Sequence, residues 1–132
     1  KAFHSVHHQH IFQVLRQKDV DGHIIDFIAE MYNSSATQLE VGGTHSEKVK
    51  ILTGVKQGDP MSPLLFNLSM DPLLCRLEEG KEGFRYKNSS VSTLAFTDDL
   101  VLLSDSWDGM QKNIQVVEEF CHQTGLKVHA AK

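Results

Sequence analysis

The chain has 132 residues, 40% of them hydrophobic, which allows one core of ordinary domain size and argues against two independent domains. Its formal net charge of −4 excludes a strongly positive field that would attract nucleic acid unaided. No apolar run approaches the roughly 20 residues that a membrane-spanning helix needs, so no membrane contact is predicted. The chain begins at Lys1 without a methionine and ends at Lys132, and we expect it to be a segment excised from something longer.

Two helices and a hairpin are predicted in the first half of the chain. The first helix is expected over residues 5–18, and a second, capped by Asp21, over residues 21–32. The apolar residues at helical spacing, expected to be buried, are Ile11, Val14 and Leu15 on the first helix and Ile24, Ile25, Phe27, Ile28 and Met31 on the second. Alternating stretches at 37–41 and 47–51, separated by a glycine-containing loop, are typical of a β-hairpin.

A third helix is predicted to begin at Ser62, with this serine as the cap and Pro63 at the first helical position. Pro72 should kink the helix or force it to restart, because proline lacks the N–H that a helix interior uses. Residues 80–90 are polar and are expected to form a loop, with a short strand at 84–86.

The last part of the chain predicts a hairpin, a helix and a strand. Asp98 and Asp99 stand between two apolar, strand-like runs, and Gly125 is placed to close the helix that follows. The apolar stripe expected to face the core of that helix, rather than to stack on bases, consists of Trp107, Met110, Ile114, Val117 and Cys121. A final strand is expected over 126–128. This order of elements predicts an α+β fold with helices packed on one face of an antiparallel sheet, in a single domain over residues 1–132.

The two cysteines, Cys75 and Cys121, form no CxxC pair and are expected to be buried small apolar residues. Such use of cysteine favours a reducing compartment.

The adjacent carboxylates Asp98 and Asp99 have two explanations. Two like charges beside apolar segments cost electrostatic and desolvation energy, which a divalent cation with a preference for carboxylate oxygens would relieve. The alternative is an ordinary polar hairpin turn, where aspartate is favoured.

The loop over residues 54–63 leads directly into the predicted third helix. Gly58 would let the backbone approach a ligand closely, and a helix N-terminus favours anionic phosphate. The alternative is a turn followed by a helix cap, with no ligand.

Four segments, taken together, resemble the motifs of reverse transcriptases from non-LTR retrotransposons, in particular the R2-like group. Residues 1–8 resemble motif A (KAFDxVxH in the family), 57–67 motif B, 95–100 motif C and 125–132 motif D (GLxxNxxK in the family). The resemblance implies the palm of an RNA-directed DNA polymerase, with the fingers and thumb outside this chain. It also implies an RNA template, a DNA primer, deoxynucleoside triphosphates and, by analogy, work in the nucleus.

The resemblance further implies roles for individual residues. Asp98 would bind Mg²⁺ or Mn²⁺ in a two-metal nucleotidyl transfer, with Asp99 as a supporting carboxylate. The residues implied to line the template and the nucleotide are Gln57, Gly58 and Phe3. Lys132 would lie near the triphosphate and supply a proton to the leaving pyrophosphate.

Three motif positions depart from the family. His4 replaces the motif A aspartate, His129 replaces the motif D asparagine, and Thr97 replaces the alanine before Asp98. Because an imidazole nitrogen suits Zn²⁺ or Cu²⁺ better than Mg²⁺, we expect His4 to impair transfer and the chain to be a degenerate copy.

Two alternatives remain open. The domain could be non-catalytic and bind RNA or protein, since a scaffold has no need of aspartate at position 4. It could instead hold a metal on a group of histidines, His4, His7, His8 and His10. Four histidines at the start of a helix are more often solvated, and their spacing is not an established zinc pattern.

Overall fold

The computed structural model describes residues 2–56 and 58–129. The helices in this part of the chain are η1 (Ala2–His4, 3₁₀), α1 (His8–Gln17), α2 (Gly22–Asn33), α3 (Ser62–Glu79) and α4 (Trp107–Thr124). The strands are β1 (Ala36–Thr37), β2 (Glu40–Val41), β3 (Thr44–His45), β4 (Val49–Lys50), β5 (Phe84–Tyr86), β6 (Ser89–Val91), β7 (Thr93–Phe96) and β8 (Asp99–Leu102). They pair as antiparallel two-stranded ladders, β1–β4, β2–β3, β5–β6 and β7–β8. The α+β prediction is confirmed, with the antiparallel sheet present as short separate ladders in the described residues.

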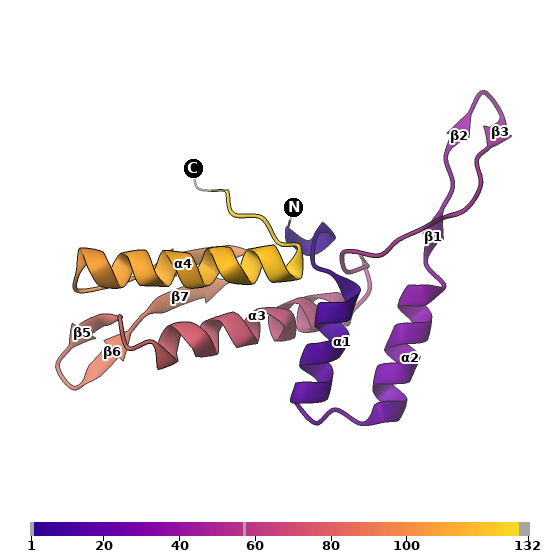
Figure 1. Ribbon diagram of the computed structural model, residues 1–132. Coiled ribbons are helices and arrows are strands. Elements are labelled where there is room, and N and C mark those ends of the chain that lie inside the picture. The colour runs from indigo at the N-terminus through magenta and orange to yellow at the C-terminus, as the bar shows by residue number, and fades with distance from the viewer. Residues whose placement is uncertain (1, 57, 130–132) are drawn as a thin grey trace.

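The helices pack in a chain of neighbours around one hydrophobic cluster. Helix α1 contacts α2 and α3, α3 contacts α4, and the β7–β8 ladder lies against α3 and α4 (Figure 1). The most buried apolar side chains of this cluster are Val6, Ile11, Leu15, Ile28, Tyr32, Leu65, Phe66, Leu73, Leu77 and Phe120. The ladder that carries Asp98 and Asp99 is therefore backed by two long helices, as the palm-like prediction requires.

Helix α3 differs from its prediction at its N-terminus. It is capped by Met61, and Ser62 is its first, buried residue, so the predicted cap lies one residue too late. Of the two effects predicted for Pro72, a kink or a restart, the restart does not occur, because the helix is continuous through the proline. Leu73 and Leu77, which follow the proline, are almost fully buried, and their packing outweighs the loss of one backbone hydrogen bond.

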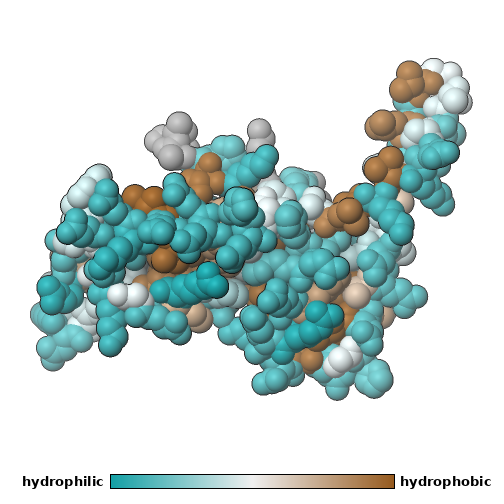
Figure 2. Space-filling model, viewed as in Figure 1, coloured by the Kyte–Doolittle hydropathy of each residue, from teal (hydrophilic) through white to brown (hydrophobic). Residues whose placement is uncertain are grey.

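The hairpin predicted between α2 and α3 is confirmed, but its turn is shorter than the expected loop. Ladders β1–β4 and β2–β3 form one long arm over residues 36–50, here called the projecting hairpin (Figure 1). Gly42 and Gly43 both have positive φ, 60° and 82°, as a tight two-residue turn requires. Figure 2 shows apolar surface on this arm, to which Leu39 and Val41 contribute with exposed fractions of 66% and 78%.

The β5–β6 and β7–β8 hairpins agree with the prediction, except that β6 is a strand that was not predicted. The strand at Phe84–Tyr86 is confirmed and pairs with Ser89–Val91 in the stretch that was expected to be loop. The hairpin around the two aspartates is confirmed as well, with Phe96 opposite Asp99.

Helix α4 forms as predicted, but only part of the predicted apolar stripe faces the core: Val117 is buried and Cys121 packs against the core, whereas Ile114 is exposed. Trp107 is 73% exposed, whereas the polar Asn113 is buried and its amide nitrogen lies 3.4 Å from Glu82 O. Gly109 and Asn113 lie on the inner face, where small or hydrogen-bonded groups allow close packing. The prediction of Trp107 as a core residue is therefore wrong.

Several other burial and strand predictions are also wrong. Ile24 and Phe27 of α2 are exposed, and Cys75 is exposed on α3 while Cys121 is half-buried. Residues 126–128 form no strand, because no described segment pairs with them. Among the described helices, none combines the length and apolar character required to span a bilayer.

Candidate functional site

The turn of the β7–β8 hairpin carries the predicted carboxylates. Asp98 lies in the turn itself, Asp99 is the first residue of β8, and both are exposed. Thr97 precedes them with a φ of 56°, in the left-handed region that a β-branched residue rarely adopts. The hairpin thus carries two neighbouring, exposed carboxylates at a two-residue turn.

The segment of residues 2–8, here called the N-terminal segment, is bound to the residues that precede the motif B loop. The N–H of Val55 donates to Phe3 O at 2.7 Å, and the N–H of Gly54 donates to Val6 O at 2.7 Å. The N–H of His8 donates to Leu52 O at 3.3 Å. Motif A and the segment of residues 52–55, which precedes motif B, are therefore held side by side by backbone hydrogen bonds, although about 50 residues separate them.

Gly54 lies directly against the backbone of His4. A Cβ built on this glycine would be 2.7 Å from His4 Cα and 2.9 Å from His4 O, and the φ of Gly54 is +84°. Both the close approach and the backbone conformation require glycine here. The backbone of Gly54 is thus in direct contact with the backbone of residue 4, the position at which this sequence departs from the motif A pattern.

His8 is buried between these two segments. Its Nε2 lies 2.8 Å from Gly54 O, and its ring meets Tyr32 edge-on with a centroid distance of 4.6 Å. Because a carbonyl oxygen only accepts, Nε2 carries the proton in this neutral imidazole. Burial lowers the pKa of His8, an effect only partly offset by its hydrogen bond to Gly54.

His10 repeats this arrangement two residues later. Its Nε2 lies 2.8 Å from Ser69 O of α3, its ring meets Phe120 edge-on, and burial lowers its pKa. The expectation that the histidines at the start of α1 are solvated is wrong for His8 and His10. Both bind separate backbone carbonyls.

The end of α4, where motif D begins, also contacts the N-terminal segment. The N–H of His7 donates to Thr124 O at 2.9 Å. Gly125 closes the helix with a φ of 79°, and a Cβ on it would be 2.8 Å from Ser5 O. The N-terminal segment, which contains motif A, therefore contacts both residues 52–55, which precede motif B, and Gly125, where motif D begins.

The motif B loop is ordered by its own polar groups. The carboxylate of Asp59 accepts from the Met61 N–H at 2.8 Å, and the Ser62 hydroxyl donates to Lys56 O at 2.5 Å. The Lys56 ammonium donates to Met31 O at 2.9 Å and lies 5.8 Å from the centroid of the Tyr32 ring. These contacts fix both ends of the loop that the sequence assigned to the template and the nucleotide.

The residues predicted to line the template have different surroundings. Gly58 is exposed with a φ of 85°, and a Cβ there would meet nothing within 4 Å. Phe3 is half-buried and stacks on Phe66 of α3 with a centroid distance of 4.3 Å. Gln57 and Lys132 lie outside the described residues, so their predicted roles stay predictions.

The structure gathers no metal-binding cluster from the described ranges, in which no group of three or more His, Cys, Asp or Glu side chains could hold an ion. The histidine cluster proposed from the sequence is not among such groups. The roles of Asp98, Asp99 and His4 as metal ligands remain predictions.

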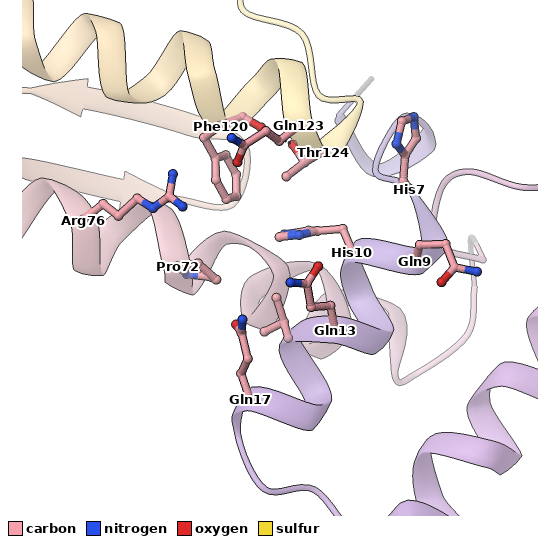
Figure 3. A pocket seen from close by; sticks show the side chains of 11 residues that line it. His7, Gln9, His10, Gln13, Gln17, Pro72, Arg76, Phe120, Gln123 and Thr124 are labelled. Carbon is pink, nitrogen blue, oxygen red and sulfur yellow. Dashed lines mark hydrogen bonds between the residues drawn. The ribbon is translucent and has the colours of Figure 1, made fainter.

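A pocket of about 210 Å³ lies away from the two aspartates, between α1, α3 and α4 (Figure 3). His10 points into it from α1 toward Phe120, while Arg76 and Pro72 line it from α3. Glutamine side chains form much of its rim, namely Gln9, Gln13, Gln17 and Gln123. No predicted catalytic residue lines it.

Gly54 and Tyr32, which both contact His8, were not predicted from the sequence to be site residues. Gly54 stands three residues before the quoted motif B segment, and a glycine at that place is compatible with any turn. Tyr32 ends an amphipathic helix and reads as a core residue. Only His8 had a signal in the sequence, its match to the last position of the motif A pattern.

The family described as reverse transcriptase (RNA-dependent DNA polymerase) matches residues 1–132. A Pol polyprotein from a type-1 retrotransposable element R2 of Nasonia vitripennis is 39% identical over all 132 residues, and that from the type-2 element R2DM of Drosophila melanogaster is 38% identical. A type-1 R2 polyprotein of Popillia japonica is 41% identical over 106 residues, 80% of this chain. The chain spans 13%, 12% and 18% of the lengths of these three relatives.

Proposed function

Because the chain belongs to the reverse transcriptase family, we propose that it is the palm of an R2-like RNA-directed DNA polymerase whose metal-dependent nucleotidyl transfer is impaired by His4. The observation that supports this function best is the pair of carboxylates, Asp98 and Asp99, at the tip of the β7–β8 hairpin. The strands that carry the carboxylates pack against α3 and α4, and a functional site built on packed secondary structure is positioned better than one on a loop.

The donor atoms of the chain do not fit a pair of Mg²⁺ ions well. Reverse transcriptases work with divalent metal ions, which in two-metal sites are held by carboxylates that bridge or flank them. Asp98 and Asp99 supply hard oxygen donors, but position 4 supplies an imidazole nitrogen. No third acidic or imidazole group joins them into a cluster within the described part of the chain. This disagreement is the reason for proposing impaired transfer.

The substrates follow from the same proposal. An RNA template, a DNA primer and deoxynucleoside triphosphates would lie over the motif B loop at Gly58, which is exposed and where a Cβ would meet no atom of the described, non-adjacent residues within 4 Å. The hydrogen bonds from the Met61 N–H to Asp59 and from the Ser62 hydroxyl to the Lys56 carbonyl join described residues of that loop to one another.

The test is Mn²⁺ binding, followed by paramagnetic broadening of backbone amides in NMR. The 132-residue chain is compared with His4→Asp and with the double variant His4→Asp/Asp98→Asn. We expect His4→Asp to broaden the amides around residues 4 and 98 at roughly tenfold lower Mn²⁺ than the unmodified chain, because a carboxylate restores charge at position 4.

The double variant tests the contribution of Asp98, and it should lose the gain in Mn²⁺ affinity that His4→Asp provides. Equal affinity in the unmodified chain and in His4→Asp would remove the proposed impairment. Undiminished binding by the double variant would show that Asp98 is not a ligand.

The alternative function is a non-catalytic domain that binds RNA or protein. It is favoured by one observation, the imidazole at position 4. On this alternative His4→Asp gives no gain in Mn²⁺ affinity, while RNA binding measured by filter retention is the same with and without the metal.

A further inference from the structure

We propose that His8 is a positioning residue, whose buried imidazole fixes the backbone of residue 4 against Gly54 and thereby places the motif A position relative to the motif B loop. The inference rests on the proposed function, since the place of residue 4 matters to activity only if that residue belongs to the nucleotidyl-transfer site.

Gly54 is bound to the N-terminal segment through both of its backbone polar groups. Its N–H donates to Val6 O at 2.7 Å, and its carbonyl accepts from His8 Nε2 at 2.8 Å. Gly54 is thus held by Val6 and by His8, the two residues that flank His7. Removal of the imidazole donor releases one of these two attachments.

The same glycine carries the contact with residue 4. Because His4 Cα would lie only 2.7 Å from a Cβ on Gly54, the two backbones touch with no side chain between them. Val55 N–H continues the contact by donating to Phe3 O at 2.7 Å. A shift of Gly54 therefore moves the surface on which residue 4 rests.

The surroundings of His8 make this hydrogen bond hard to replace. The residue is 6% exposed, and its ring lies edge-on to Tyr32 at 4.6 Å between centroids. Tyr32 also lies beneath the Lys56 ammonium, which belongs to the motif B loop. Within residues 2–56 and 58–129, His8 Nε2 is the side-chain group that hydrogen-bonds to the Gly54 carbonyl, and a buried carbonyl that loses its donor is costly to leave unsatisfied. His8 thus links α2, the N-terminal segment and the start of the motif B loop.

The chain offers a matched control for a merely structural role. His10 lies on the same helix, also donates through Nε2 to a backbone carbonyl at 2.8 Å, and also meets an aromatic ring edge-on. The carbonyl to which His10 donates belongs to Ser69 of α3, and not to the 52–55 segment. Loss of either imidazole removes a comparable internal contact, but only loss of His8 releases Gly54.

The first measurement is amide hydrogen exchange by NMR in the 132-residue chain. In His8→Phe, which keeps an aromatic ring but no donor, the amides of Gly54 and Val55 should exchange 10- to 100-fold faster relative to the amide of Val117 in α4. His10→Phe should leave that ratio unchanged. His8→Gln, whose amide nitrogen reaches nearly the same place as Nε2, should restore it. If His8→Phe proves too unstable to measure, His8→Asn, whose side chain is too short to reach the carbonyl, takes its place.

A uniform acceleration of all amides in His8→Phe, or an equal change in His10→Phe, would show that His8 only stabilises the fold and would overturn the proposal.

The second measurement is the midpoint of the Mn²⁺ titration in the His4→Asp background. His8→Phe should raise the Mn²⁺ concentration at this midpoint about tenfold, and His8→Gln should not. An unchanged midpoint in a His4→Asp chain that does bind Mn²⁺ also overturns the proposal. If His4→Asp binds no Mn²⁺ at all, the proposed function fails instead, and the exchange ratio still decides whether His8 positions residue 4.

Discussion

At the scale of single residues, Thr97 stores strain beside the two carboxylates. Within the described residues, the non-glycine positions with positive φ are Asp19, Lys81, Lys87 and Thr97, and Thr97 alone among them is β-branched. A left-handed conformation costs a residue with a Cβ roughly 1–2 kcal/mol. We therefore predict that Thr97→Gly stabilises the chain by about 1 kcal/mol, and that Thr97→Asn does so by somewhat less. Urea unfolding with an unchanged slope measures this gain. If Thr97→Ala stabilised the chain equally, the side-chain branch and not the backbone angle would be the source of the strain.

The same residue marks what the sequence can and cannot predict at this scale. The position of Asp98 in a hairpin turn follows from the alternating apolar runs beside it, which are local. The sign of φ at Thr97 depends on which two residues occupy the turn, and this is settled by the pairing of Phe96 with Asp99. Gly54 was not recognised because its requirement for glycine comes from His4, 50 positions away in the sequence.

At the scale of elements, α1 makes the fold sensitive to acid. His8 and His10 both have a lowered pKa in the folded chain, in each case mainly because burial penalises the charged imidazole. The neighbouring charges act in the same direction, His7 on both residues and Lys56 on His8. The pKa of a histidine in an unfolded chain is near 6.5. Below about pH 6.5 the unfolded chain therefore binds more protons than the folded chain, and the folded state loses stability.

We therefore predict that the free energy of unfolding falls as the pH drops below about 6.5, until the lowered pKa values of the folded state are passed. Urea unfolding between pH 8 and pH 5 measures it, and the double variant His8→Gln/His10→Gln should have a flatter profile over this range. An equally steep loss in the double variant would assign the effect to carboxylates or to other histidines.

The elements also show why some boundaries were predictable and the buried faces were not. Asp21 caps α2 through the His23 N–H at 2.8 Å, and Gly125 closes α4, both through local chemistry that the sequence displays. The face that α4 buries depends on its neighbours. The amide of Asn113 finds carbonyl partners at Glu82 and Leu103, and this turns Trp107 outward. Such a partner cannot be read from the spacing of apolar residues.

At the scale of the whole molecule, the order of helices and hairpins was predictable, whereas the assembly of the strands was not. The α+β architecture follows from alternating and helical spacings along the chain. A strand at 126–128 would have required a neighbour, and the described residues supply none. The β7–β8 ladder became the best supported part of the prediction because its two strands are adjacent in the sequence and pair with each other.

The exposed apolar side chains of the projecting hairpin and α2 give the last prediction. Phe27, Leu39 and Val41 are 60%, 66% and 78% exposed, and Figure 2 shows apolar surface along the arm. Because exposed apolar surface and short, open strand edges favour association, we predict that the 132-residue chain self-associates at about 10–100 µM. The triple variant Phe27→Ser/Leu39→Thr/Val41→Thr should stay monomeric over that range, as followed by sedimentation velocity. Leu64→Thr, which removes a 60% exposed leucine from α3 instead, is the control and should associate like the unmodified chain. A monomer at all these concentrations, or an equal effect of Leu64→Thr, would show that the hairpin and α2 do not form the associating surface.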